Sequence, residues 1–137
     1  MTFDAQMRIG SVEIVAALAA VAFVAARPRA RKAVEVIRRT PVQVALRITG
    51  FGSEGHFEGM CPLVIGRAGD ANVVVNDAEV SRRHARLESE NGIVYVRDLE
   101  SRNGTFLNGR RVREAIEVRK GDEIDVGATR LVVEELR

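Results

Sequence analysis

The C-terminal part of the chain, residues 42–137, predicts an all-β domain, either a β-sandwich or a small barrel. Short segments in this region alternate apolar and polar residues, which is the period of a strand that buries one face. Three Asn-Gly pairs stand between such segments, at 91–92, 103–104 and 108–109. Asn-Gly supplies the positive φ angles of tight hairpin turns, so this spacing argues against helices.

The predicted strands follow one another at short intervals. In chain order they contain the segments VALRI, LVIG, VVV, ARLE, IVYVRDL, TFL, IEV, EIDV and TRLVVEE. Further turns are predicted at Lys120-Gly121-Asp122 and at Val126-Gly127. Many short strands separated by turns are typical of sandwiches and barrels. The segment with helix-like composition, RKAVEVIRR, precedes the domain and is assigned to a linker, residues 27–41.

An apolar run of 18 residues, 9–26, follows an N-terminal tail of residues 1–8. As a helix it would be ~27 Å long, close to the ~30 Å hydrocarbon thickness of a bilayer. We interpret this run as a single transmembrane helix. A cleaved signal sequence is an alternative, although only Arg8 and the terminal amine supply its basic region. An amphipathic surface helix would need a polar face, which residues 14–26 do not offer.

The charges that flank the apolar run predict its orientation. Only Arg8 precedes the run, and the basic residues that follow it are Arg27, Arg29, Arg31, Lys32, Arg38 and Arg39. The positive-inside rule therefore places the C-terminal side in the cytoplasm. The sequence predicts a single-pass protein of the plasma (inner) membrane with its β domain in the cytoplasm. The basic linker 27–41 would lie on anionic lipid or act as a solvated spacer.

Composition argues against several functional classes. Seven of the 21 Lys and Arg residues lie in residues 1–41, which leaves 14 for residues 42–137, against 16 of the 19 Asp and Glu residues. The β domain therefore lacks the positive excess expected of a nucleic-acid-binding domain. Cys61 is the single cysteine, and His56 and His84 are the only histidines. No disulfide, metal site or cofactor is expected from this set.

The segment EVSRRHARLE, residues 79–88, contains a serine, two arginines and a histidine in succession. A hydrolase would combine Ser81 with His84 and Asp98. In a strand, positions three apart point to opposite faces, so Ser81 and His84 could not meet unless Ser81 lay in the preceding loop. There is no G-x-S-x-G motif, and GRAGDAN at 66–72 lacks the ending of a nucleotide P-loop. We therefore do not expect this chain to be an enzyme.

A phosphate-binding site explains the loop residues of this domain better than a hydrolase or a nucleotide-binding site does. Arg67, Ser81, and Arg102 with Asn103 fall in three different strand-connecting loops of the predicted domain. They offer guanidinium groups, a hydroxyl and an amide, which match the charge and the three acceptor oxygens of a phosphorylated side chain. The alternative is that all four are ordinary loop residues, and the difference depends on whether the loops converge.

Four motifs occur in order along the domain: IGR at 65–67, VSRRHARL at 80–87, DLESRNGTFLNG at 98–109 and GDEIDVG at 121–127. In order and spacing they resemble the forkhead-associated (FHA) domain, and the resemblance covers residues 42–137. It implies a β-sandwich of about eleven strands that binds phosphothreonine peptides through loops at one end, without catalysis. It also implies two kinds of partner, a phosphothreonine-containing protein and a Ser/Thr protein kinase.

The resemblance assigns roles to individual residues. It implies a phosphopeptide-binding set made of Arg67, Ser81, Arg82, Arg102, Asn103 and Asn108. Ser81 would bind the phosphate, Asn103 the peptide main chain, and Asn108 the residue after the phosphothreonine. Gly66, His84 and Gly104 would brace the loops, and Arg83 would be a solvated strand residue. Glu100 departs from the family pattern, because the family often has glycine there.

Two functions follow as hypotheses. The first is a membrane-tethered phosphothreonine-binding adaptor in Ser/Thr kinase signalling. The second is a scaffold of a membrane complex, of the envelope or of division, that uses the same sandwich independently of phosphorylation. Thr40, in the segment RRTPV, is in addition a candidate kinase target whose phosphate would dock on the domain of the same or another copy. The simpler interpretation is an ordinary linker threonine.

Overall fold

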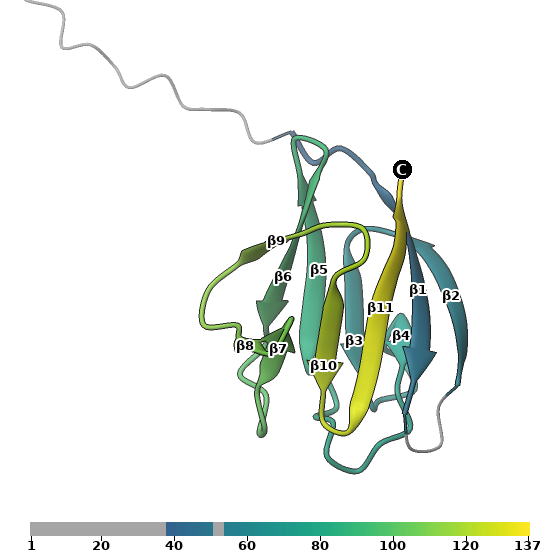
Figure 1. Ribbon diagram of the computed structural model, residues 1–137, viewed down its shortest axis with the longest axis vertical. Coiled ribbons are helices and arrows are strands. Elements are labelled where there is room, and N and C mark those ends of the chain that lie inside the picture. Colours follow the sequence, from purple (N-terminus) through teal and green to yellow (C-terminus); the bar gives the residue numbers. More distant parts are fainter. Residues whose placement is uncertain (1–37, 51–53) are drawn as a thin grey trace, which may run out of the picture. The chain divides into compact units, whose positions relative to one another are not determined.

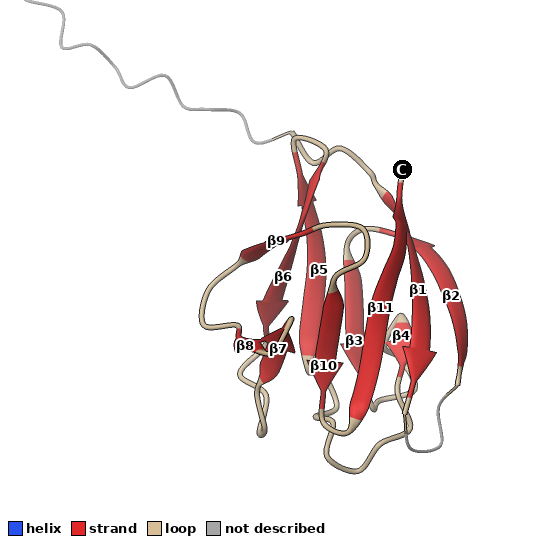
Figure 2. Ribbon diagram, viewed as in Figure 1, coloured by secondary structure: helices blue, strands red, loops and turns tan. Residues whose placement is uncertain are grey.

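The computed structural model describes residues 38–50 and 54–137, and its secondary structure there consists of strands and loops (Figure 2). The predicted tail 1–8, the predicted transmembrane helix 9–26 and residues 27–37 of the linker lie outside the described residues. Within the described part of the chain, no helix has the length and apolar character needed to cross a membrane.

Eleven strands lie in the described part of the domain, which confirms the all-β prediction and the expected number of strands. They are β1 (Gln43–Thr49), β2 (Gly55–Met60), β3 (Leu63–Gly66), β4 (Val73–Val74), β5 (Ala85–Glu90), β6 (Ile93–Asp98), β7 (Thr105–Leu107), β8 (Arg110–Arg111), β9 (Ile116–Val118), β10 (Glu123–Val126) and β11 (Thr129–Leu136).

The strands form two sheets that face each other (Figure 1). One sheet has the order β2-β1-β11-β10-β7-β8, and the other has the order β4-β3-β5-β6-β9. Neighbouring strands are antiparallel except for β3 and β4. Buried and partly exposed residues alternate along β5, as expected for a strand with one face on a core. The core between the sheets includes Leu46, Ile65, Leu87, Ile124 and Leu131, all with no exposed surface.

Two of the three Asn-Gly pairs form hairpin turns. Asn91-Gly92 joins β5 to β6 and Asn108-Gly109 joins β7 to β8, and all four residues have positive φ, as a type I′ turn requires. At Asn103-Gly104 only the glycine has positive φ. This pair ends the loop between β6 and β7, which belong to different sheets. This pair therefore ends a strand-connecting loop, as the sequence predicted, and does not form a hairpin.

Ser81 lies in a loop, as predicted, whereas Arg83, which was expected in a strand, lies in the same loop. Strand β5 begins at Ala85, so Ser81 to His84 form the end of a loop and not part of a strand. The backbone N–H of His84 donates to Ile65 of β3 at 2.8 Å, which holds the end of this loop against the sheet. Strand alternation therefore does not decide which way Ser81, Arg82 and Arg83 point.

Cys61 precedes β3 and is buried. Burial raises the pKa of its thiol to about 11, so the thiol stays protonated at neutral pH.

Candidate functional site

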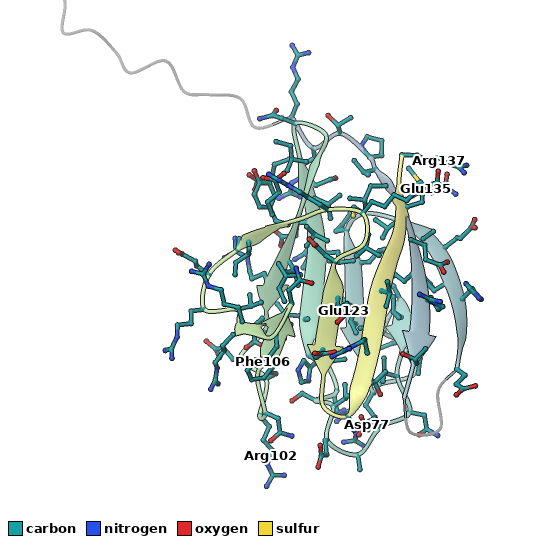
Figure 3. All side chains as sticks on the ribbon, in the orientation of Figure 1. Asp77, Arg102, Phe106, Glu123, Glu135 and Arg137 are labelled. Atoms are coloured by element: carbon teal, nitrogen blue, oxygen red, sulfur yellow. The ribbon has the colours of Figure 1, made fainter. Side chains whose placement is uncertain are left out.

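Three loops meet at one end of the sandwich. They are residues 67–72 between β3 and β4, residues 75–84 between β4 and β5, and residues 99–104 between β6 and β7. Figure 3 shows Arg102 and Asp77, from two of these loops, at the same end. The loops line an open groove of about 560 Å³. Four of the six predicted phosphopeptide-binding residues line it together, namely Arg67, Ser81, Arg82 and Arg102.

His84 connects two of the loops from below the groove. Its imidazole is completely buried. Nδ1 accepts a hydrogen bond from the backbone N–H of Ser81 at 3.0 Å, and Nε2–H donates to the carbonyl oxygen of Gly104 at 2.9 Å. Because one ring nitrogen accepts and the other donates, the ring is neutral and its proton is on Nε2. The predicted bracing residue thus holds the loop that contains Ser81 to the loop that contains Arg102.

Ser81 presents a hydroxyl donor to the groove. Its Oγ accepts a hydrogen bond from the backbone N–H of Arg102 at 2.9 Å, and its carbonyl oxygen accepts one from the N–H of Arg67 at 3.0 Å. A serine hydroxyl accepts through its lone pairs and donates its own proton. With an acceptor position already in use, Ser81 keeps the O–H proton for a ligand oxygen.

Four arginines line the groove and have no ion pair with any described carboxylate: Arg67, Arg82, Arg83 and Arg102. The Nε–H of Arg67 donates to the carbonyl oxygen of Val80 at 3.2 Å, which orients this guanidinium and leaves its two terminal nitrogens without a partner among the described residues. Asp70 and Glu79 also line the groove, so its formal charge is +2. Residues 42–137 as a whole carry 14 basic and 16 acidic side chains, so the positive charge is local to the groove.

Arg83 was predicted to be a solvated strand residue, and the structure places it in the groove wall. It is exposed, as predicted, but it lies in the loop before β5. Because the irregular backbone of this loop turns successive side chains toward the same opening, a period of two could not find this residue.

Asn103 lies beside the groove and ties two loops together. Its Nδ2–H donates to the carbonyl oxygen of Glu79 at 2.7 Å. The Oδ1 end of the amide has no hydrogen-bond partner among the described residues and faces solvent. The side chain can therefore accept a hydrogen bond from the main-chain N–H of a bound peptide.

Asn108 is not brought to the groove. Its Nδ2–H donates to Oδ1 of Asp122 at 3.0 Å, and its Oδ1 accepts from the backbone N–H of Glu123 at 2.9 Å. Both ends of the amide are thus used to fasten the β7–β8 turn to the start of β10. The structure thus shows an internal role for Asn108, and its contact with the residue after the phosphothreonine stays a prediction.

Gly66 and Gly104 act through the absence of a side chain. A Cβ on Gly66 would collide with the carbonyl oxygen of Arg82 and lie 2.8 Å from its carbonyl carbon. Gly104 has φ +85°, which favours glycine, and its N–H donates to Oγ of Ser101 at 2.9 Å. Gly66 therefore allows two backbone segments to approach closely under the groove, and Gly104 allows the left-handed backbone of its turn.

Asp98 organises the loop that contains Arg102. Its carboxylate accepts hydrogen bonds from the hydroxyl of Ser101 and the hydroxyl of Thr105, both at 2.6 Å, and from the N–H of Ser101 at 3.0 Å. Burial alone would raise the pKa of Asp98, but these hydrogen bonds outweigh burial and lower the pKa below its ordinary value of 3.8. Asp98 thus fixes the conformation of the loop that contains Arg102.

Ser81, His84 and Asp98 do not form a catalytic triad. Ser81 bonds to His84 through its backbone N–H and not through Oγ, and Nε2 of His84 is directed to Gly104. Asp98 is bound by Ser101 and Thr105. A triad needs the imidazole to accept the hydroxyl proton while the carboxylate holds its other nitrogen, and neither contact is present.

Asp77 fixes the loop 75–84 to the turn between β10 and β11, a role that no motif in the sequence indicates. Its Oδ1 accepts from the N–H of Glu79 at 2.9 Å, and its Oδ2 accepts from the N–H of Ala128 at 2.8 Å and the hydroxyl of Thr129 at 3.0 Å. The hydrogen bond from Glu79 lowers the pKa of Asp77 most, burial opposes it, and the bonds from Ala128 and Thr129 help to hold the pKa below 3.8.

Acid is expected to destabilise the domain partly through Asp77. Because the folded-state pKa is lower than the unfolded-state value, ionised Asp77 stabilises the fold above about pH 4, and this contribution is lost as the pH falls through the folded-state pKa. Urea unfolding of Asp77→Asn between neutral and acid pH should show a shallower fall in the free energy of unfolding. Equal slopes for Asp77→Asn and wild type would contradict this role.

Glu100 stands at the position where the resemblance led us to expect glycine. Its side chain does not line the groove. Glu100 is exposed, and its φ is +55°. Glycine is favoured at this φ because it has no Cβ. The change to glutamate thus affects backbone strain and adds no acidic group to the groove.

Metal binding has no support in residues 38–50 and 54–137. Within these residues no group of three or more His, Cys, Asp or Glu side chains is placed to hold an ion.

Comparisons with known proteins agree with this arrangement. The family model of the FHA domain matches residues 63–127. The FHA domain-containing protein FhaB of Mycolicibacterium smegmatis is 43% identical over 71 residues, which are 52% of this chain and 46% of that protein. The chain therefore spans less than half of the length of this curated relative.

Two solved structures cover the domain more completely. One comes from a structural and functional analysis of phosphothreonine-dependent FHA domain interactions; it is 30% identical, has a TM-score of 0.60 and is matched over 97% of its length and 70% of this chain. The other is the FhaA FHA domain complexed with the intracellular domain of Rv3910, at 31% identity, a TM-score of 0.59, 98% of its length and 66% of this chain. The motifs, the eleven-stranded sandwich and these matches together place the chain in the FHA domain family.

Proposed function

We propose that the chain is a phosphothreonine-peptide-binding adaptor in Ser/Thr kinase signalling, held at the plasma membrane by residues 9–26 with its FHA domain in the cytoplasm. The observation that carries the binding function is the groove in which Arg67, Ser81, Arg82 and Arg102 meet. It is a local concentration of positive charge on a domain that is otherwise slightly acidic.

The donors in the groove match a phosphate dianion. The hydroxyl of Ser81 and the terminal nitrogens of Arg67 are free to donate, and the guanidinium of Arg102 is exposed above them. A charge-assisted hydrogen bond contributes ~1.5–3 kcal/mol net, so three such bonds approach the ~8.2 kcal/mol of a micromolar complex. The exposed Oδ1 of Asn103 would add a contact to the peptide main chain.

The comparisons support this function by analogy. A solved structure that is 30% identical to this chain comes from work on phosphothreonine-dependent FHA interactions. Another, at 31% identity, was solved as a complex with an intracellular domain. Both are consistent with a domain that recognises other proteins in the cytoplasm. The missing triad geometry around Ser81 favours binding over catalysis.

Arg67→Ala and Ser81→Ala are each expected to lower the affinity for phosphothreonine peptides by roughly ten- to hundredfold, because each removes donors to the phosphate. Titration calorimetry with the full chain measures this change, and circular dichroism should show an unchanged fold. Arg113→Ala removes an exposed arginine outside the groove and should leave the affinity unchanged. Wild-type affinity in both groove variants would exclude the proposed site.

The same titration separates the adaptor from a phosphorylation-independent scaffold. A threonine peptide and its phosphothreonine and phosphoserine forms are compared at the same sequence. The adaptor requires that the phosphothreonine form bind most tightly. Equal binding of all three forms would support the scaffold instead.

The membrane tether rests on the sequence of residues 9–26 and the basic residues that follow it. The full chain is expected to remain with membranes after an alkaline wash, and a chain lacking residues 9–26 is expected to be released. Protease added outside intact cells should not reach the FHA domain. A soluble full chain, or a mature N-terminus after residue 26 in mass spectrometry, would rule the tether out.

A further inference from the structure

Thr40 lies at the start of the described chain and is accessible. It is exposed, and its hydroxyl has no hydrogen bond within the described residues. Its main chain is fixed, because its carbonyl oxygen accepts from the hydroxyl of Ser89 at 2.6 Å and the carbonyl oxygen of Arg38, two residues earlier, accepts from the N–H of Asn91 at 3.0 Å. Arg38 and Arg39 precede Thr40, and Pro41 follows it. A kinase can therefore reach this hydroxyl on a defined surface of the domain.

Thr40 and the groove are at opposite ends of the sandwich. Thr40 contacts Ser89, near the last residue of β5, whereas Ser81 and Arg83 come just before the first residue of β5. The six residues of β5 span ~20 Å at ~3.3 Å per residue. Figure 3 shows the same separation between Arg102 at the groove end and Arg137, whose main chain bonds to Gln43, at the other end.

Thr40 cannot reach the groove of its own copy while the sandwich is intact. Gln43 is the first residue of β1 and is held by two main-chain hydrogen bonds to Arg137. Three residue steps separate Thr40 from Gln43, a reach of ~10 Å even when fully extended. Val42, within this segment, is buried and accepts a hydrogen bond from Cys61. The reach is about half of the ~20 Å length of the strands that separate the two ends.

The groove is complementary in charge to the segment around Thr40. Besides its arginines it is lined by Asp70 and Glu79, which have no ion pair with any described side chain. Arg38 and Arg39 likewise have none among the described residues. A phosphorylated Thr40 would present a dianion to the groove arginines, and the two arginines beside it would meet the two carboxylates.

We propose that Thr40 is a phosphorylation site and that its phosphate is bound by the groove of a second copy of this chain. This inference rests on the proposed phosphothreonine binding. Because the phosphate and the groove are at opposite ends of one body, each copy offers one donor end and one acceptor end. Contacts of this kind join copies head to tail and do not close into a two-fold dimer.

The modification itself is a phosphoryl transfer from ATP by a Ser/Thr kinase. A bond forms between Oγ1 of Thr40 and the γ-phosphorus, the bond from that phosphorus to the β–γ bridging oxygen breaks, and ADP leaves. The hydroxyl proton passes to the base of the kinase. Pro41 has no backbone N–H, so the new phosphate has no donor from the residue that follows it and remains available to a partner.

A mixing experiment with full chains in a mild non-ionic detergent tests the proposal. The donor copy carries phosphothreonine at position 40 and the change Ser81→Ala, and the acceptor copy carries Thr40→Ala and an intact groove. Fluorescence energy transfer between C-terminal labels is expected for the mixture and for neither copy alone. Loss of phosphate from the donor should weaken the association by roughly tenfold or more.

Three results would overturn the proposal. In the first, an unrelated phosphothreonine peptide binds the acceptor but the phosphorylated donor does not, which leaves the proposed function intact. In the second, a phosphorylated chain with an intact groove stays monomeric and does not bind added phosphothreonine peptide at any dilution. This would mean that the groove binds the phosphorylated Thr40 of the same copy. In the third, no phosphothreonine peptide binds the unmodified chain, and the proposed function then fails as well. Mass spectrometry after kinase treatment must also find phosphate on Thr40.

Discussion

Replacing His84 with alanine is expected to lower the free energy of unfolding by about 3 kcal/mol or more. The imidazole is completely buried, and its loss leaves the Ser81 N–H and the Gly104 carbonyl without their partner. Each unsatisfied buried group costs ~1–3 kcal/mol, and the cavity left by the ring adds to this. Because the two loops are then no longer joined, phosphopeptide affinity should also fall in the molecules that remain folded. Urea unfolding and calorimetry measure the two effects.

The second histidine provides the control. His56 is exposed, and its contact with Glu134 is on the surface, so His56→Ala should change stability little. His84→Gln tests the hydrogen bonds separately from the volume, because a glutamine amide can still donate to Gly104 but leaves Ser81 unmatched. Its stability should fall between wild type and His84→Ala. Equal stabilities for His56→Ala and His84→Ala would refute the bracing role.

Gly66→Ala is expected to open the groove. A Cβ at this position would collide with the carbonyl oxygen of Arg82 and lie 3.1 Å from Cα of Arg83. The obstacle is backbone, which cannot rotate away as a side chain can, so the loop must move off β3. That movement breaks the hydrogen bonds from Arg67 N–H to Ser81 and from Ala68 N–H to Arg82. We expect a loss of about 1–3 kcal/mol in stability and at least tenfold in phosphopeptide affinity.

Gly69 is a matched control in the neighbouring loop. A Cβ there would have no atom within 4 Å, and its φ lies outside the left-handed region. Gly69→Ala should keep the wild-type stability and affinity within the error of the measurement. If Gly66→Ala bound phosphopeptide as tightly as Gly69→Ala, close packing of the two backbones could not be a requirement of the groove.

Most of the fold follows from short-range rules. The alternation of apolar and polar residues predicted β1, β5 and β6. The two Asn-Gly hairpins have the positive φ angles that this pair of residues favours. Strand β2, GHFEGM, was not predicted because it is an edge strand without a buried face, and only Phe57 packs against the core from it. Strand β8 was missed because two residues, Arg110 and Arg111, are too short to show a period.

The candidate site was predictable in part. Arg67, Ser81, Arg82 and Arg102 were found through motifs, because their chemistry suits phosphate and their loops have a recognisable order. Asn108 bonds to Asp122 and Glu123, and the sequence of a turn does not tell whether its amide bonds within the domain or to a ligand. Arg83 was missed for a different reason, since the direction of a loop side chain depends on tertiary hydrogen bonds and not on sequence period.

The sequence by itself determined the all-β class, the positions of the hairpin turns and the residue types available to bind phosphate. These properties depend on backbone preferences and side-chain chemistry, which act over a few residues. Only the tertiary structure decided that three loops from two sheets converge, that His84 joins them, and that Thr40 lies at the far end from the groove. These depend on strand order and on contacts between residues distant in the chain, which no local pattern records.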